Sequence, residues 1–435
     1  MLALIGFAMI GVIIFLLLQE KLHPAVVFVI VPVVAALLAG AGMADLAKFV
    51  KFGVEKTTSV AVLFIFSITY FCVMNDTGMF DKMVDVLTRK AGNNVVLVTV
   101  ATTVIAIIGH LDGALASTIL ITCPAMLPVY RRLNMRPVVM LVCLGAAMSI
   151  MNLVPWGGPT ARVAAITGMD VQLLWTKMLP VQAIGLIIAL LFAAYMGVVE
   201  KRRGAGYRPD AELCVGDDCL DPAAAAALKR PKLVLFNVAL TLVVIGLLCF
   251  SSLPAYFDFM IGLAIALTVN YPSVKEQTAR IKAHAAEALS VPAVLLTTGI
   301  FLGVLTGTNM LDAMSSALIS VIPDVFGPFL HLIMGVLAVP VGMMLGTDSY
   351  FFGLVPLAIK VGQQFGIDQL DMAYAMLIGK NYGVLVTPHA ATTYLAIGMA
   401  GGISLKEHLS FCMPRLWLLS LISLVLAVVF GVVHI

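Results

Sequence analysis

Long apolar runs separated by short polar stretches cover most of the chain. Runs long enough for a membrane-spanning helix recur along it. They lie near residues 2–18, 24–43, 57–75, 137–153 (continuing to 168), 171–199, 233–251, 254–270, 290–307, 371–402 and 411–434. The first run lacks a preceding positive residue and a small-residue cleavage site, so it predicts a span rather than a signal peptide. The pattern predicts an all-α polytopic membrane protein.

Two further apolar pairs each meet at a polar apex. Residues 94–109 and 116–130 meet at GHLDGALAST, and 326–344 and 350–362 meet at LGTDSY. A polar turn inside the hydrocarbon region is tolerated only where it faces protein or water. We therefore expect two re-entrant hairpins with buried tips, at 93–133 and 326–363.

The sequence repeats itself at a nearly constant offset. TGMFDKM, beginning at Thr77, resembles TNMLDAM, beginning at Thr308, and Pro155 corresponds to Pro388. This offset predicts two units, 1–200 and 233–435, joined by a cytoplasmic linker, 201–232. Each unit has an odd number of crossings, so the second is inverted relative to the first. The predicted fold is two inverted repeats of five spans, each with a re-entrant hairpin and a broken helix (137–168 and 371–402).

Charge sets the expected orientation. On this topology most lysines and arginines fall on one side, and only Lys48, Lys51, Lys56 and Lys177 on the other. By the positive-inside rule the first side is cytoplasmic and both termini lie outside. We expect the protein in the cytoplasmic (inner) membrane of a bacterium, surrounded by lipid, with no nucleic-acid partner.

Composition agrees with this class, since 61% of residues are hydrophobic and only 11% are charged. The chain has no phosphate-binding loop, no Ser/His/Asp arrangement and no HExxH motif, so neither an ATPase nor a hydrolase is indicated. We expect no enzyme activity and no permanently bound cofactor. Active transport would then depend on an ion gradient.

The segment PWGGPTAR, residues 155–162, lies inside an apolar run that should be one helix. Two prolines with Gly157 and Gly158 between them predict an unwound stretch and a second half-helix beginning near Thr160. The free N–H groups at such a start attract anions. The second unit contains a matching break, VTPHAATTYL, residues 386–395. Two inverted breaks beside two hairpin tips predict one central site.

Charged residues at the tips and breaks are candidates for this site. Arg162 could clamp a carboxylate and Lys380 could add a second positive charge, or either could snorkel or pair with an Asp. Asp112 and Asp348 could carry a proton, ligate a hard cation or metal, or cap the following helix. His110 and His389 could titrate, or could be hydrogen-bonded structural groups.

Neutral polar residues gather at the same four places. They are Ser117, Thr118, Asn152, Thr347, Asn381, Thr387, Thr392 and Thr393. Asp81 and Asp312, by contrast, lie in amphipathic stretches and predict caps or interfacial anchors.

At HLDGALAST, NLVPWGGPTARVAA and GTDSYFFGLVP the sequence resembles citrate symporters that carry citrate complexed with a divalent metal together with protons, within the ion transporter superfamily. The resemblance implies inverted repeats, homodimers and an elevator-like motion of a transport domain against a fixed scaffold. It places the substrate and cation site at Asp112, Ser117, Thr118, Asp348 and Ser349 in the tips, and at Asn152, Gly157, Gly158, Thr160, Thr392 and Thr393 in the breaks.

Two positions depart from that family's pattern: Ala114 stands where a second acidic residue is usual, and Lys380 where a neutral one is usual. The leading hypothesis is a proton-driven importer of a small polycarboxylate, citrate above all, with or without Mg²⁺ or a similar co-transported metal. Alternatives are a metal-free di- or tricarboxylate symporter coupled to H⁺ or Na⁺, a passive anion channel or exchanger, and the membrane subunit of an ATPase-dependent complex.

Overall fold

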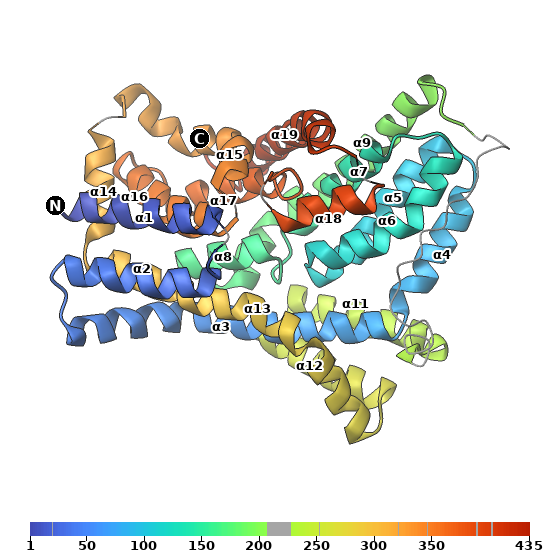
Figure 1. Ribbon diagram of the computed structural model, residues 1–435, viewed down its shortest axis with the longest axis horizontal. Coiled ribbons are helices and arrows are strands. Elements are labelled where there is room, and N and C mark those ends of the chain that lie inside the picture. Colours follow the sequence, from blue (N-terminus) through green and yellow to red (C-terminus); the bar gives the residue numbers. More distant parts are fainter. Residues whose placement is uncertain are drawn as a thin grey trace.

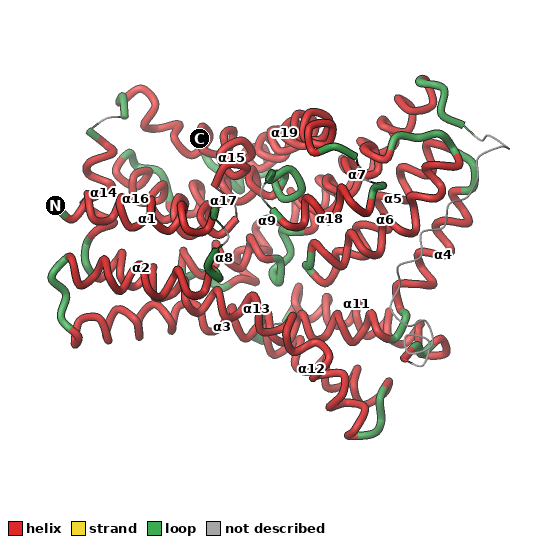
Figure 2. Tube along the Cα trace, viewed as in Figure 1, coloured by secondary structure: helices red, strands yellow, loops and turns green. Residues whose placement is uncertain are grey.

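The computed structural model describes residues 1–19, 21–206, 228–251, 253–320, 322–345, 347–388, 390–401 and 403–435. Every regular element within these ranges is a helix, and Figure 2 shows the helices joined by loops. Seven helices of the described chain are long and apolar enough to cross a membrane, and shorter apolar helices accompany them. The protein is an all-helical, multi-pass membrane protein.

The first half contains a short 3₁₀ turn, η1, and nine α-helices among its described residues. In chain order they are α1 (Leu2–Leu18), α2 (Pro24–Leu38), α3 (Met43–Asp76), α4 (Met79–Ala91), α5 (Val95–Gly109), η1 (His110–Asp112), α6 (Leu115–Arg132), α7 (Pro137–Met151), α8 (Gly158–Thr167) and α9 (Val171–Arg202).

The second half follows the same order of long, short and interrupted helices. Its elements are η2 (Pro231–Leu233), α11 (Val234–Phe250), α12 (Ala255–Asn270), α13 (Val274–Gly307), α14 (Met310–Ile319), η3 (Asp324–Phe329), α15 (Leu330–Leu345), the π-helical η4 (Ser349–Leu354), α16 (Val355–Gln364), α17 (Gln369–Asn381), α18 (Ala391–Met399) and α19 (Leu405–Val429). Residues 207–227 of the expected linker lie outside the described residues.

Helices α3 and α13 are longer than the apolar runs at 57–75 and 290–307 predict, and each has 34 residues. Their added turns are polar. In α3 the extension carries Lys48 and Lys51, which pair with Asp45 and Glu55 one turn away. In α13 the side chain of Ser273 caps the helix by accepting from the backbone N–H of Glu276. A search for apolar runs misses such turns.

Helices α3 and α13 pack closely against each other, and Figure 1 shows them side by side along one long edge of the molecule. Glycine makes the contact possible. A Cβ built on Gly53 would lie 1.8 Å from the carbonyl oxygen of Gly299, and one on Gly303 would lie 2.1 Å from that of Phe49. The two backbones therefore touch directly, as small residues allow between membrane helices.

Helices α7 and α17 are enclosed by protein. Residues 138–151 of α7 and 371–381 of α17 are all buried. Helix α7 packs on α5, α6, α9 and α19, while α17 packs on α15, α16, α19 and α8. A helix that is apolar on all sides, as α7 is, belongs in such an interior, whereas α17 also buries Asp371, Lys380 and Asn381. The chain leaves helical geometry directly after both helices, so both irregular stretches lie inside protein rather than against lipid.

Candidate functional site

The first break separates α7 from α8 across residues 152–157. The hydroxyl of Thr160, in the first turn of α8, donates to the freed carbonyl of Asn152 at 3.1 Å. A Cβ on Gly157 would lie 2.3 Å from that same oxygen, so only glycine fits here. Helix α8 begins at Gly158, two residues before the expected start. The break is thus a compact turn with its own hydrogen bonds.

His110 ties the first hairpin tip to the first break. Its Nδ1 lies 2.6 Å from the hydroxyl of Thr118, and its Nε2 lies 3.1 Å from Oδ1 of Asn152. The His110 side chain is fully buried. Both ring nitrogens are therefore used structurally, which corresponds to the hydrogen-bonded alternative for this histidine.

Asp112 closes the same tip from the other side. Its Oδ1 accepts from the backbone N–H of Ala114 at 2.8 Å, and its Oδ2 accepts from the hydroxyl of Ser117. These contacts resemble a helix cap at the start of α6. The carboxylate is held by neutral donors within its own tip.

Trp156 connects this assembly to the neighbouring helices. Its Nε1 donates to the carbonyl of Leu111 at 2.6 Å. The ring packs on Phe71 of α3 and Phe259 of α12, with centroid separations of 5.7 and 5.1 Å. Sequence reasoning quoted Trp156 inside a motif but gave it no role, because its partners lie far away in the chain.

The second break separates α17 from α18. The hydroxyl of Thr393 donates to the carbonyl of Thr387 at 2.8 Å, and Thr387 donates to the carbonyl of Gly383 at 2.9 Å. His408, from α19, contacts the carbonyl of Leu385 at 2.8 Å through Nε2. Sequence reasoning missed His408, since it lies outside every motif. Thr392 is half-buried, and His389 lies outside the described residues.

Arg162 and Asp348 join the two halves of the chain. Both Nε and Nη2 of Arg162 donate to Oδ1 of Asp348, at 2.9 and 2.7 Å. The side chains are 13% and 23% exposed. Asp348 makes no capping hydrogen bond to η4. The pair matches the alternative in which Arg162 finds an Asp, and it places a break of one half against the hairpin tip of the other.

Three residues near this pair in sequence or in space have buried polar atoms without a hydrogen-bond partner in the described structure. They are Ser349 (Oγ), which follows Asp348, Lys380 (Nζ), and Asn381 (both amide atoms), which follows Lys380 in α17. Lys380 is 1% exposed, and its Nζ lies 6.0 Å from the ring centroid of Tyr350. It interacts electrostatically with both Arg162 and Asp348. Buried polar groups nearly always have partners, so this cluster indicates a place for a polar ligand.

Glycines make room for the lysine. A Cβ on Gly342 would lie 2.2 Å from Cδ of Lys380, and one on Gly383 would lie 3.6 Å from its Nζ. Two cations, Arg162 and Lys380, then face a single carboxylate, Asp348. This excess positive charge, with an amide and a hydroxyl close in sequence, suits an anion with several oxygen atoms.

The two halves therefore differ. The first-half candidates His110, Asp112, Thr118 and Asn152 bond to one another or to local backbone. In the second half Ser349, Lys380 and Asn381 have unfilled hydrogen-bonding capacity. Within the described residues, no three His, Cys, Asp or Glu side chains gather as metal ligands.

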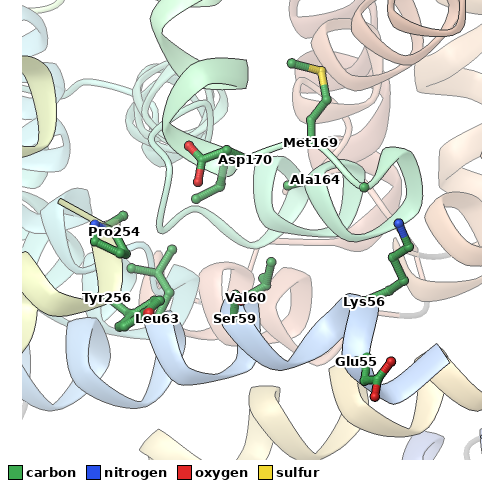
Figure 3. Close-up of a pocket in the computed structure, with 13 residues that line it drawn as sticks. Glu55, Lys56, Ser59, Val60, Leu63, Ala164, Met169, Asp170, Pro254 and Tyr256 are labelled. Atoms are coloured by element: carbon green, nitrogen blue, oxygen red, sulfur yellow. The ribbon is translucent and has the colours of Figure 1, made fainter. Parts of the chain in front are cut away.

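A pocket of about 390 Å³ lies elsewhere, between α3, the α8–α9 turn and the start of α12 (Figure 3). Its lining includes Glu55, Lys56 and Tyr256, and Asp170, which caps α9 through its carboxylate. A second pocket of about 260 Å³ shares Lys56 with it. Neither pocket is lined by the buried polar cluster. The second pocket lies where α8 and α16 face the α3–α13 pair.

Comparison with known proteins gives a consistent result. The sequence model described as "Citrate transporter" matches residues 13–379. A Bacillus subtilis (strain 168) protein named "Citrate transporter" is 35% identical over 437 residues, covering both chains completely. Another from the same organism, "Mg(2+)/citrate complex secondary transporter", is 34% identical over 437 residues, again with full coverage of both chains.

Among solved structures, the fold resembles the crystal structure of the YdaH transporter of Alcanivorax borkumensis. The TM-score is 0.61 at 15% sequence identity, and the match covers 87% of this chain and 86% of that one. At this identity the likeness concerns the fold alone. From the family match and the two full-length relatives above 30% identity, the chain belongs to the citrate transporter family, a family of transporters rather than enzymes.

Proposed function

We propose that this protein is a secondary active transporter that imports a small polycarboxylate, citrate in particular, coupled to protons. The observation that supports it most directly is the buried cluster of Lys380, Asn381 and Ser349 beside the Arg162–Asp348 pair. An enclosed cation with free donors around it binds an anion strongly, because the surrounding protein screens charge poorly. Its place between the two breaks is the place where membrane transporters bind substrate.

The proposal includes the architecture that carries this site. Residues 1–200 and 233–435 form inverted repeats, with re-entrant hairpins at 93–133 and 326–363 and a cytoplasmic linker between them. The recurrence of helix lengths in the two halves supports this reading. The α3–α13 pair, with backbones in direct contact, is suited to a fixed scaffold against which hairpins and broken helices move as in an elevator. The proposed architecture also includes a homodimer in the bacterial inner membrane, with both termini outside.

Substrate roles go to the residues of both tips and breaks. In the first half they are Ser117, Thr118, Asn152, Gly157, Gly158, Thr160 and Arg162, and in the second Ser349, Lys380, Asn381, Thr392 and Thr393. Asp112 and Asp348, with His389, would serve the coupling cation, H⁺ or Na⁺, while His110 would hold the first tip against the first break. Support comes from the hydrogen bonds that join His110 and Asp112 to substrate-site candidates.

Citrate could travel free or with a divalent cation. The relative named "Mg(2+)/citrate complex secondary transporter" supports the complex. Lys380 supports the free acid, because a fixed ammonium at the site repels a second cation. Asp112 and Asp348 could contact the metal only as additions to the acid's own oxygens.

The test is uptake of labelled citrate into proteoliposomes under an inward proton gradient, with Mg²⁺, with Ca²⁺ and with a chelator. Accumulation above equilibrium supports a symporter, while equilibration without accumulation would indicate a channel or exchanger. Loss of uptake in the chelator means that citrate travels as the metal complex. Persistence of uptake means that Lys380 supplies the charge. Absence of citrate uptake under every condition would remove the proposed function.

A further inference from the structure

Arg162 has the chemistry of a carboxylate clamp, yet a carboxylate of the protein already occupies it. Two of its N–H groups donate to one oxygen of Asp348, at 2.9 and 2.7 Å. Guanidinium N–H groups bind carboxylates in this way whether the carboxylate is part of a protein or of a ligand. Asp348 therefore stands where a substrate carboxylate would bind.

The neighbouring buried polar groups, unlike Arg162, have no hydrogen-bond partner among the described residues. Ser349 follows Asp348 directly, and its hydroxyl is buried without a partner, as are Nζ of Lys380 and the amide of Asn381. Lys380 interacts electrostatically with both members of the Arg162–Asp348 pair. Arg162 thus already binds one carboxylate, while nearby buried donors have hydrogen-bonding capacity that no described residue fills.

We propose that Asp348 is an internal competitor of the substrate: it holds Arg162 in the empty carrier, and a substrate carboxylate entering at Lys380 and Asn381 displaces it. This inference rests on the proposed function of the site. The exchange replaces one carboxylate on Arg162 with another, so the arginine never loses its counter-ion. Because Arg162 belongs to the first half and Asp348 to the second, the exchange also breaks an ion pair between the halves.

The test is citrate binding to the full-length protein in detergent, measured by titration calorimetry for a set of variants. Asp348→Asn removes the competing charge with little change in shape, and we expect about a tenfold lower Kd. Asp81→Asn is the matched control, since Asp81 forms an ion pair of 2.8 Å with Lys229 away from the site, and its Kd should equal that of the wild type.

A double variant separates displacement from simple charge removal. If Asp348 acts through Arg162, Asp348→Asn should change the Kd less than about twofold in an Arg162→Gln background. An equal gain in both backgrounds would mean general electrostatics and overturn the inference. Weaker binding in Asp348→Asn would make Asp348 a ligand and also overturn it.

Asp348→Ser, a smaller neutral replacement, should also lower the Kd for citrate. It replaces the Asn variant if that variant does not purify as a monodisperse protein. The wild type separates the two proposals. If wild-type protein binds neither citrate nor its Mg²⁺ complex, the proposed function fails. If it binds citrate but Asp348→Asn does not bind more tightly, only the displacement fails.

Discussion

At the scale of single residues, both breaks supply hydrogen-bond donors to freed backbone carbonyls, but they differ in the hydrogen-bonding capacity that is left unfilled. In the first, His110 and Thr160 return hydrogen bonds to Asn152, and little capacity is left over. In the second, Thr393 and His408 satisfy the freed carbonyls, but among the described residues Nζ of Lys380 and the side-chain amide of Asn381 have no hydrogen-bond partner. The first break is therefore the more structural of the two, and the second the more receptive to a ligand.

Lys380 gives the clearest test at this scale. Lys380→Met keeps the length of the side chain but removes the buried charge. We expect thermal stability to stay equal or rise, since a buried charge without a hydrogen bond is unfavourable. Citrate uptake should fall about 10- to 100-fold, because a hydrogen bond to a charged group contributes about 1.5–3 kcal/mol.

Lys360→Met is the matched control, because Lys360 pairs with Asp312 at 2.9 Å on a partly exposed surface. It should change uptake and stability little, as exposed pairs contribute about 0–1 kcal/mol. Wild-type uptake by Lys380→Met would contradict the assignment of the ammonium to substrate binding.

His110 should behave as a structural residue. His110→Ala leaves the hydroxyl of Thr118 and Oδ1 of Asn152 short of a partner in a buried place. Each such group costs about 1–3 kcal/mol, so the melting temperature in detergent should drop clearly. His23→Ala, at an exposed helix start, is the comparison and should lower it much less. An unchanged melting temperature for His110→Ala would mean that water replaces the ring.

Residue roles were only partly predictable from sequence. The polar cluster at tips and breaks could be named because such residues are rare inside apolar runs. The pairing of Arg162 with Asp348 could not, since the two are 186 positions apart and meet only through the placement of the halves. His408 and Trp156 were missed for the same reason: their contacts are set by tertiary packing.

At the scale of elements, the α3–α13 contact depends on four glycines: Gly53, Gly299, Gly303 and Gly307. Gly299→Ala places a Cβ 2.5 Å from the carbonyl oxygen of Gly53 and 2.8 Å from Oγ1 of Thr57. The helices must separate, which costs about 1–3 kcal/mol as overpacking. We expect a lower melting temperature and lower yield of purified protein.

Gly246→Ala, also inside an apolar helix but with no atom within 4 Å of its Cβ, is the matched control. It should be neutral or stabilising by up to about 1 kcal/mol through helix propensity. Equal behaviour of the two alanine variants would mean that the crossing tolerates separation.

The sequence predicted the positions of the helices better than it predicted the contacts of single residues. Apolar runs located nearly every helix, and the Pro and Gly pairs located the first break to within two residues. The polar extensions of α3 and α13 were missed because charged turns carry no hydropathy signal, even though Ser273 and Glu276 form a recognisable cap. Helical geometry also begins inside LGTDSY, the expected apex of the second hairpin, because Asp348 has helical dihedral angles and η4 begins at Ser349.

At the scale of the whole molecule, the proposed orientation makes a prediction about access. In a variant without native cysteines, Lys56→Cys should react with a membrane-impermeant maleimide added to intact cells. Lys201→Cys should react only after the membrane is opened, because it lies on the positively charged side. Lys56 is exposed in the recess of Figure 3, and Lys201 is exposed near the end of α9. The reverse labelling pattern would invert the topology.

The all-helical, multi-pass class was predictable because membrane insertion leaves few alternatives: an apolar chain of this kind must be helical where it meets lipid. The relative placement of the two halves was not, since no local pattern encodes it. The contacts that fix it, such as Gly53 with Gly299, involve residues that carry little information one at a time.

Trp156 has a mechanical consequence. Through Leu111 and His110, the first tip and the first break are bonded into one body, so this tip cannot swing open like a lid while the break stays still. Toward α3 and α12, however, Trp156 makes aromatic ring contacts, tilted with Phe71 and edge-to-face with Phe259. If the first tip and break moved along α3 and α12, these ring contacts would change without breaking a hydrogen bond of Trp156. The contact therefore opposes such sliding only weakly.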